Sequence, residues 1–421
     1  MPQPASRHRA ISDPLTSGRG VAPNRARSGS LRVLLLLVCL TAAVPLFAQG
    51  PPADEPNGDL SEAQRAFLAE PAAVDGGSAV TVPEHSVLCV DGDAEGYSCE
   101  RVDLLAHLPL NTIGGGSGAD LWGWTDPMTG KEYALMGLTN GTAFVDISDP
   151  EEPVHLGNLP THTVNSTWRD IKTYGNYAYI VSEASGHGLQ IFDLTELRSV
   201  TTPPVTFTET AHYPGFGRAH NVVLDEATGF AYAVGSRENS APFEACSGGL
   251  HMIDLSNPTA PTFAGCFSAD GYTHDAQCVV YHGTDSEHDG AEICFASNED
   301  TLTIVDVTDK GSPQQLSRTS YTGVGYTHQG WLTEDHKYFL LDDELDESNF
   351  GHNTRTYIWD LADLEAPSVL GTYTGPVASS DHNQYVKGRY VYQANYKSGL
   401  RILSLDDVGS GSLTEVAHFD I

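Results

Sequence analysis

Four histidines stand at equal spacing in this chain: His220, His274, His328 and His382 follow one another at intervals of 54 residues. They open the segments RAHNVVLD, YTHDAQCV, YTHQGWLT and SDHNQYVK. Neutral imidazole is a common ligand for zinc, copper, iron and nickel, and it can also carry protons near neutral pH. Side chains that occur once per repeat can form one site only if the repeats close around a common axis.

Acidic side chains recur beside these openings and in the loops that follow the next expected strand of each repeat. Carboxylates suit calcium or manganese, so a divalent metal such as calcium is one candidate cofactor, although the sequence does not identify it. The predicted ligand-binding residues are His220, His274, His328, His382, Asp170, Asp275, Glu183 and Glu299. The predicted metal ligands are His274, His328, Asp343 and Glu344.

A structural interpretation of the same residues stays open. Histidines and aspartates at fixed repeat positions also serve to hydrogen-bond one strand to another. The acidic run DDELDE at 342–347 lacks the spacing of an EF-hand loop, and the chain has no Gly-x-Ser-x-Gly motif of a serine hydrolase.

Five tryptophans could stack sugars, but their place inside repeats favours core packing. These are Trp122, Trp124, Trp168, Trp331 and Trp359.

A second repeated feature is a short apolar strand that ends in Asp and leads into a turn. The turn chemistry of Asp predicts that its side chain accepts a hydrogen bond there. Such strands end at Asp146, Asp193, Asp254, Asp306 and Asp360, and a weaker copy begins at Leu400. Six repeats with four short strands each predict an all-β propeller. An open solenoid is the less favoured alternative because its repeats are shorter.

Residues 102–110 (VDLLAHLPL) resemble the predicted outer strand at 153–160 (PVHLGNLP). We therefore expect an unpaired outer strand before the first repeat, and a seven-bladed parent ring whose closing blade is incomplete. A six-bladed ring, with this first strand covering an edge, is the alternative.

The N-terminal region reads as an export signal. Six arginines and one aspartate in residues 1–32 precede an apolar run from Val33, and small residues follow near Ala48. We expect residues 1–49 to be a signal peptide, 50–84 a flexible linker and 85–421 the propeller. The mature chain is then expected to be secreted, either free or associated with the cell surface, without a membrane span.

Charge and cysteine content agree with that location. Loss of the signal's six positive charges and one negative charge changes the net charge from −33 to −38, which disfavours nucleic acid as a partner. Six cysteines remain, and an even number in an exported chain indicates disulfides. Pairing of near neighbours predicts Cys89 with Cys99, Cys246 with Cys266, and Cys278 with Cys294, one of 15 possible connectivities.

The sequence resembles the choice-of-anchor B family, exported bacterial proteins related to LVIVD-repeat propellers. The resemblance runs from about Cys89 to Ile421 and includes CFSADGYTHDAQCVVYHG from Cys266 and NEDTLTIVDVTDKGSPQQLSR from Asn298. It implies secretion, a propeller fold and a C-terminal surface anchor, before which this sequence stops. It brings no established catalytic residues.

These observations predict a binding module at the cell exterior, with its ligand surface at the mouth of the central channel. The expected partner is an extracellular protein or a glycan. The alternative is a metal-dependent hydrolase or lyase that uses the same histidine and carboxylate face.

Overall fold

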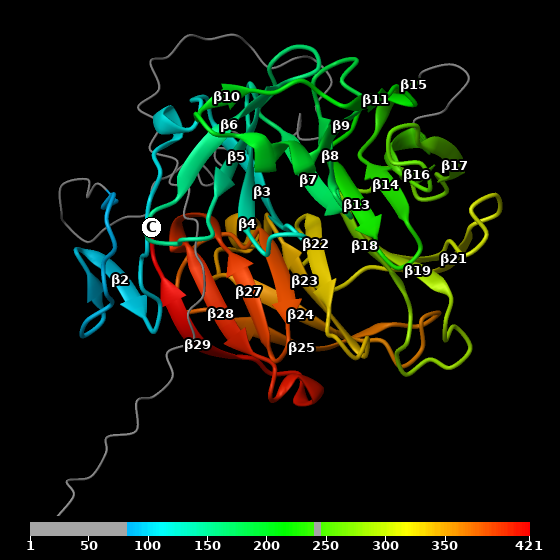
Figure 1. Cartoon of the computed structure of the whole chain (residues 1–421). Helices are drawn as coiled ribbons and strands as arrows, with labels where there is room; N and C mark the ends of the chain where they lie inside the picture. Colours follow the sequence, from blue (N-terminus) through cyan, green and yellow to red (C-terminus); the bar gives the residue numbers. More distant parts are fainter. Residues whose placement is uncertain (1–81, 240–245) are drawn as a thin grey trace, which may run out of the picture. The chain divides into compact units, whose positions relative to one another are not determined.

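Six antiparallel sheets of four core strands each form the blades of a β-propeller in the computed structural model, which describes residues 82–239 and 246–421 (Figure 1). The predicted signal peptide at 1–49 and nearly all of the predicted linker at 50–84 lie outside these residues. The repeats predicted from the sequence correspond to the blades, so the predicted all-β propeller is confirmed with six blades.

Each blade runs from an inner strand at the channel to an outer strand. Blade 1 contains β3 (Gly118–Thr125), β4 (Glu132–Leu138), β5 (Gly141–Asp146) and β6 (Val154–Pro160), with the short β10 (Val205–Thr206) beside β6. Blade 2 contains β7 (Arg169–Tyr174), β8 (Tyr177–Ser182), β9 (Leu189–Asp193) and β11 (Ala211–Tyr213). Blade 3 contains β13 (Asn221–Asp225), β14 (Phe230–Val234), β16 (Leu250–Asp254) and β17 (Thr262–Phe267).

The second half repeats this order. Blade 4 contains β18 (Asp275–Val280), β19 (Glu292–Ser297), β20 (Leu302–Asp306) and β21 (Gln314–Thr319). Blade 5 contains β22 (Thr327–Leu332), β23 (Tyr338–Asp343), β24 (Arg355–Asp360) and β25 (Ser368–Thr374). Blade 6 contains β26 (Asn383–Lys387), β27 (Tyr390–Ala394), β28 (Leu400–Ser404) and β29 (Thr414–Phe419). A two-stranded ribbon, β12 (Phe216–Arg218) with β15 (Arg237–Asn239), and the short helix α2 (Asp346–Phe350) lie between blade strands.

The middle strands of the blades are apolar on both faces because each sheet packs against a neighbouring blade on either side. All six residues of β19, and five of six in β23, are buried. Phe295 of blade 4 stacks on Phe339 of blade 5, with ring centroids 5.5 Å apart. Short apolar runs in the sequence therefore become inter-blade core rather than the one-sided strands of an open sheet.

The Asp at the end of each third strand plays the predicted structural role. Its Oδ1 accepts a hydrogen bond from the backbone N–H two residues later, which is an Asx turn. The acceptors are Asp146, Asp193, Asp254, Asp306 and Asp360.

The N-terminal segment covers the outer edge of blade 6, but by a different strand from the one predicted. β2 (Tyr97–Glu100) pairs with β29, and β1 (Asp93–Ala94) pairs with β2 (Figure 1). Residues 102–110, predicted as an outer strand, make only a single bridge between Leu104 and Val87. That prediction is wrong because β2 already occupies the edge of blade 6. Leu104 is instead buried in the hydrophobic cluster that includes Ile402 and Phe419 of blade 6.

Ring closure follows the six-bladed alternative. Blade 6 has four strands of its own, and the described residues contain six blades rather than the seven of the favoured expectation. Trp122 of β3 contacts Tyr385 of β26, with ring centroids 5.6 Å apart, so the first inner strand meets the last.

All three predicted disulfides are present. They join Cys89 to Cys99, Cys246 to Cys266, and Cys278 to Cys294. Cys278 and Cys294 stand directly opposite each other on β18 and β19.

Candidate functional site

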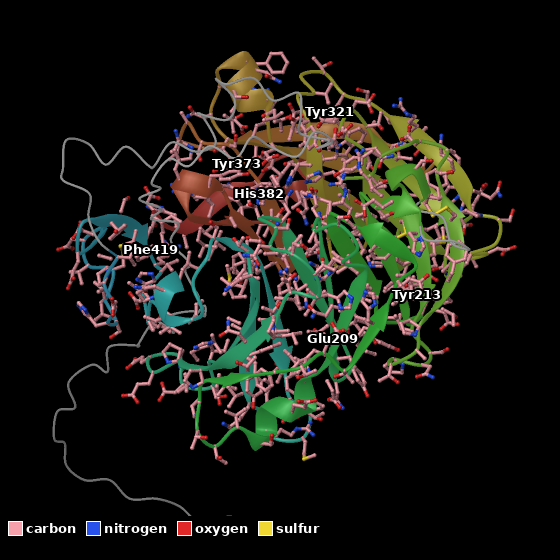
Figure 2. All side chains as sticks on the ribbon, turned by 90° about the horizontal axis from the view of Figure 1, so that it is seen from above. Glu209, Tyr213, Tyr321, Tyr373, His382 and Phe419 are labelled. Atoms are coloured by element: carbon pink, nitrogen blue, oxygen red, sulfur yellow. A yellow bond between two sulfur atoms is a disulfide. The ribbon has the colours of Figure 1, made fainter. Side chains whose placement is uncertain are left out.

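The four histidines form a continuous arc at one end of the inner strands. His220, His274 and His382 immediately precede β13, β18 and β26, and His328 is the second residue of β22. Successive ring centroids are 4.3, 4.3 and 4.5 Å apart. His382 is labelled in Figure 2. The structure thus brings together residues that are 54 positions apart in the chain, while their binding of a ligand stays a prediction.

Blades 1 and 2 carry other residues in the same register, so the arc does not encircle the channel. Ala119 of β3 and Arg169 of β7 take the place of the histidines. Arg169 is buried, donates from Nε to the Leu138 carbonyl and from Nη2 to Thr161, and contacts His187 Nε2 at 3.0 Å. Its role is to join blades 1 and 2.

The first histidine of the arc is paired with a carboxylate. Glu183 follows β8, and its Oε1 lies 2.5 Å from His220 Nδ1. Burial acts to raise the pKa of Glu183, but the hydrogen bond and charge of His220 outweigh it and lower that pKa. Burial likewise acts to lower the pKa of His220, and Glu183 outweighs it and raises that pKa. The two groups therefore stabilise each other's charged forms.

His274 lies at the centre of the arc and is almost inaccessible, with 2% of its surface exposed. Its Nδ1 lies 2.9 Å from the Tyr326 hydroxyl, and its Nε2 is buried without a hydrogen-bond partner. Burial, followed by the charges of the other three histidines, lowers the pKa of His274 well below its usual value. Tyr326 also connects His274 to Glu299, whose pKa is raised by burial.

His328 and His382 converge on one carboxylate. His328 Nδ1 lies 2.8 Å from the His382 carbonyl oxygen, so Nδ1 carries the proton and Nε2 keeps a lone pair. The Nε2 atoms of His328 and His382 lie 3.7 and 3.9 Å from the two oxygens of Glu344. The Tyr396 hydroxyl donates to Glu344 Oε1. Burial lowers the pKa of both histidines to about 3, so both rings are neutral bases at physiological pH.

This group of two imidazoles and one carboxylate can hold a transition metal. Two histidines with one glutamate are a known zinc ligand set, and a hydrogen bond from the outer ring nitrogen to a backbone carbonyl is the usual way to orient such a histidine. Calcium prefers oxygen ligands alone, so the nitrogen donors favour zinc over calcium. Of the predicted metal ligands, His328 and Glu344 are brought together here with His382.

Asp343 is placed differently. Its Oδ2 accepts from the Tyr321 hydroxyl and from the Gly325 N–H, both at 2.7 Å, and its Oδ1 accepts from the Tyr326 N–H at 2.6 Å. Both oxygens are therefore occupied in shaping the turn that leads into β22.

A cavity of about 390 Å³ lies along the channel and reaches the turns beyond the inner strands at the end away from the histidines. Among its lining residues are Trp122, Trp331 and Tyr385, whose rings are partly exposed. The Trp331 and Tyr385 rings pack edge to face, with centroids 4.9 Å apart. Lys172 Nζ lies over the Trp122 ring at 4.5 Å.

The cavity lining follows a simple rule that the sequence analysis missed. The residue three positions after the histidine position lines the cavity in every blade, because residues at equivalent positions of successive inner strands point in the same direction around the channel. These residues are Trp122, Lys172, Val223, Gln277, Trp331 and Tyr385. The last four, Val223, Gln277, Trp331 and Tyr385, are also 54 residues apart, so the sequence repeat could have identified them. Two other tryptophans, Trp124 and Trp359, are buried in the core as expected.

The residue one position after the histidine position of each repeat joins neighbouring blades. Asp170 Oδ2 accepts from the Val222 N–H at 2.7 Å, and Gln329 Oε1 accepts from the Gln384 N–H at 3.0 Å. Asp170 also binds Lys172 Nζ at 2.5 Å. This agrees with the structural interpretation of the repeated polar residues.

Asp275 occupies the same register position in blade 4 and lines the cavity. Burial raises the pKa of Asp275 to about 7. Among the predicted ligand-binding residues, it is the one that the structure places in the cavity wall.

The fold and its repeated channel define a β-propeller with a polar, aromatic-lined axis. Residues 167–199 and 245–268 match the sequence model of the LVIVD repeat, which agrees with the repeat family named in the sequence analysis. These two segments lie in blades 2 and 3.

Several solved structures are similar to this chain at low sequence identity. A functionally unknown protein from Desulfotomaculum acetoxidans is 8% identical, with a TM-score of 0.50, and the match covers 72% of this chain and 86% of that one. The β-propeller domain of Cps50 (Swd1) from Myceliophteria thermophila is 14% identical, with a TM-score of 0.45 and coverage of 72% and 87%. The periplasmic gluconolactonase PpgL from Pseudomonas aeruginosa is 10% identical, with a TM-score of 0.46 and coverage of 70% and 86%. A comparison with curated proteins found no match.

Within residues 82–239 and 246–421, no helix combines the length and the apolar character required to cross a bilayer.

Proposed function

We propose that this protein is an extracellular binding module that holds a saccharide in the central channel. The observation that carries the proposal is the cavity itself: Trp122, Trp331 and Tyr385 present partly exposed rings to one space, together with Lys172, Asp275 and Gln277. Pockets that combine a few aromatic walls with a small number of convergent polar groups are the usual form of small-molecule sites. Aromatic rings cover the apolar faces of a sugar, and the polar groups bind its hydroxyls.

The surroundings of the cavity support this class of ligand over others. The net charge of −33 disfavours nucleic acid and other polyanions. A neutral saccharide avoids that repulsion and suits a site whose charged groups, Lys172 with Asp120 and Asp170, already neutralise one another in part. The three disulfides fit an oxidising exterior, and the proposal therefore includes secretion and attachment to the cell surface in the manner of the choice-of-anchor B family.

The test is a glycan array followed by titration of any positive saccharide, with tryptophan fluorescence as the readout. We expect W331A to abolish binding and W331F to retain part of it, because the phenyl ring preserves a stacking surface. W168A is the matched control, since Trp168 is also partly exposed but does not line the cavity. Binding that W331A leaves unchanged, or that W168A removes equally, would refute the channel as the saccharide site. Capture of a protein ligand without any saccharide would refute the ligand class.

A further inference from the structure

The loop between β23 and β24 contains a second group of metal-ligand side chains. Asp346 and Glu347 begin α2, and His352 follows that helix. One ligand atom from each lies within 4.8 Å of the others. Asp346 and Glu347 are 0% and 2% exposed, while the His352 side chain is 17% exposed, so the two carboxylates are buried and the imidazole lies nearer the surface.

Each of these three side chains has one buried polar atom without a hydrogen-bond partner. These atoms are Asp346 Oδ1, Glu347 Oε2 and His352 Nε2. The remaining polar atoms are occupied: Asp346 Oδ2 accepts from the Tyr357 hydroxyl at 2.8 Å, and Glu347 Oε1 accepts from the Arg355 N–H at 3.0 Å. An unpartnered polar atom in the interior is costly unless something else binds it.

The histidine tautomer makes the case stronger. His352 Nδ1 lies 2.9 Å from the Asn353 carbonyl oxygen, so the proton resides on Nδ1. In the neutral ring the lone pair on Nε2 then faces a carboxylate, an arrangement that repels unless a proton or a metal ion lies between them. Nε2 and Asp346 Oδ2 are 3.6 Å apart. This is too long for a hydrogen bond, but two ligands at about 2.1 Å from one tetrahedral ion would be about 3.4 Å apart.

Two more acids are buried in the same part of the structure. Asp342 and Asp381 are both 0% exposed, and Asp381 interacts electrostatically with Asp342, Glu347 and Asp346. Ionised carboxylates are strongly unfavourable in an interior without a cation, so either protons or a metal ion must neutralise the acids of this region.

A third cluster of the same residue types shows what a satisfied arrangement looks like. His288 Nε2 lies 2.7 Å from Glu365 Oε1, which is a hydrogen-bond distance. The two oxygens of Asp285 accept from the Glu287 and Leu364 backbone N–H groups. Protein groups complete that cluster, so it needs no ion.

We propose that Asp346, Glu347 and His352 bind a divalent transition-metal ion of the zinc type. One imidazole and two carboxylates form a ligand set that zinc accepts and that calcium, which takes oxygen ligands, does not prefer. The ion joins the beginning of the β23–β24 loop to its end. Because Glu344 lies in the same loop, two residues before Asp346, the ion also holds Glu344 beside His328 and His382. This inference does not depend on the saccharide proposal.

The experiment uses the full chain, treated with EDTA and then titrated with Zn²⁺ by calorimetry. We expect H352Q and E347Q each to lose one equivalent of bound Zn²⁺ relative to the unsubstituted protein, and H288Q to lose none. Glutamine is isosteric with glutamate and places its amide near the position of histidine Nε2, so these variants should fold. X-ray absorption of the zinc-loaded protein should show both oxygen and nitrogen ligands.

Two results would overturn the proposal. One is an unchanged Zn²⁺ stoichiometry in both H352Q and E347Q. The other is an EDTA-treated protein that binds no Zn²⁺ at all and has an unaltered melting temperature in its presence, which would mean that protons alone neutralise the buried acids.

Discussion

Replacement of Lys172 by methionine should destabilise the propeller far more than an ordinary loss of a surface charge. Lys172 Nζ lies 2.5 Å from Asp170 Oδ1 and 3.4 Å from Asp120 Oδ2, and the three side chains are 13%, 3% and 17% exposed. They belong to blades 1 and 2, and Asp170 also binds the Val222 N–H of blade 3. Methionine keeps most of the stem that packs beside Trp122 but leaves two carboxylates in the interior without their cation.

The expected loss follows from the burial of this group. Removing one partner of a buried ion pair costs about 3–5 kcal/mol. For a urea slope of about 3 kcal/mol per molar, the unfolding midpoint should fall by about 1–2 M. K131M is the matched control, since Lys131 forms a similar pair with Asp146 at 2.7 Å but is 53% exposed. Exposed pairs contribute about 0–1 kcal/mol, so K131M should shift the midpoint very little.

The pH dependence provides a second measurement on the same variant. In K172M the buried Asp120 and Asp170 should have pKa values above those of the unfolded chain, because burial opposes their ionised forms. A group whose pKa is raised by folding destabilises the folded state at pH values above its unfolded pKa, which is near 3.9 for Asp. The stability that K172M loses relative to the unsubstituted protein should therefore shrink as the pH falls toward that value. Urea midpoints of K172M and the unsubstituted protein should therefore converge in acid. A K172M midpoint no lower than that of K131M, or a deficit that stays constant with pH, would refute the reasoning.

Two further predictions concern the disulfides and the histidine arc. Replacing both Cys278 and Cys294 by serine should lower the free energy of unfolding by about 3 kcal/mol, because the disulfide closes a separation of 16 residues. Denaturant unfolding of this variant and of the reduced protein measures the loss. An unchanged free energy of unfolding would contradict the prediction. H328A should lose one equivalent of Zn²⁺ in calorimetry while H220A loses none, because His220 binds Glu183 and lies outside the group formed by His328, Glu344 and His382. Full Zn²⁺ binding by H328A together with a lower melting temperature would instead assign His328 a purely structural role in joining blades.

Much of the candidate site could be predicted because it repeats. The positions of His220, His274, His328 and His382 follow from their spacing, since residues in equal register on successive inner strands must lie side by side in a closed ring. Glu344 was predicted to reach the same face because it follows the second strand of its blade. The place of Trp331 in the cavity wall was missed, because a tryptophan in a repeat is equally compatible with core packing, and only the strand register separates Trp331 from Trp359.

The sequence by itself determined the repeat, and with it the four-stranded blades, the turn aspartates and the short-range disulfides, because these depend on residues close together in the chain. The tertiary structure decided everything that depends on how the copies meet. It selected six blades, placed Tyr97–Glu100 rather than residues 102–110 on the last edge, and gave Asp343 to a turn and Glu344 to the histidines. The physical reason is that neighbouring residues such as Asp343 and Glu344 have the same charge and nearly the same local pattern. Their different roles arise only from which strands and loops of other blades lie within hydrogen-bonding distance.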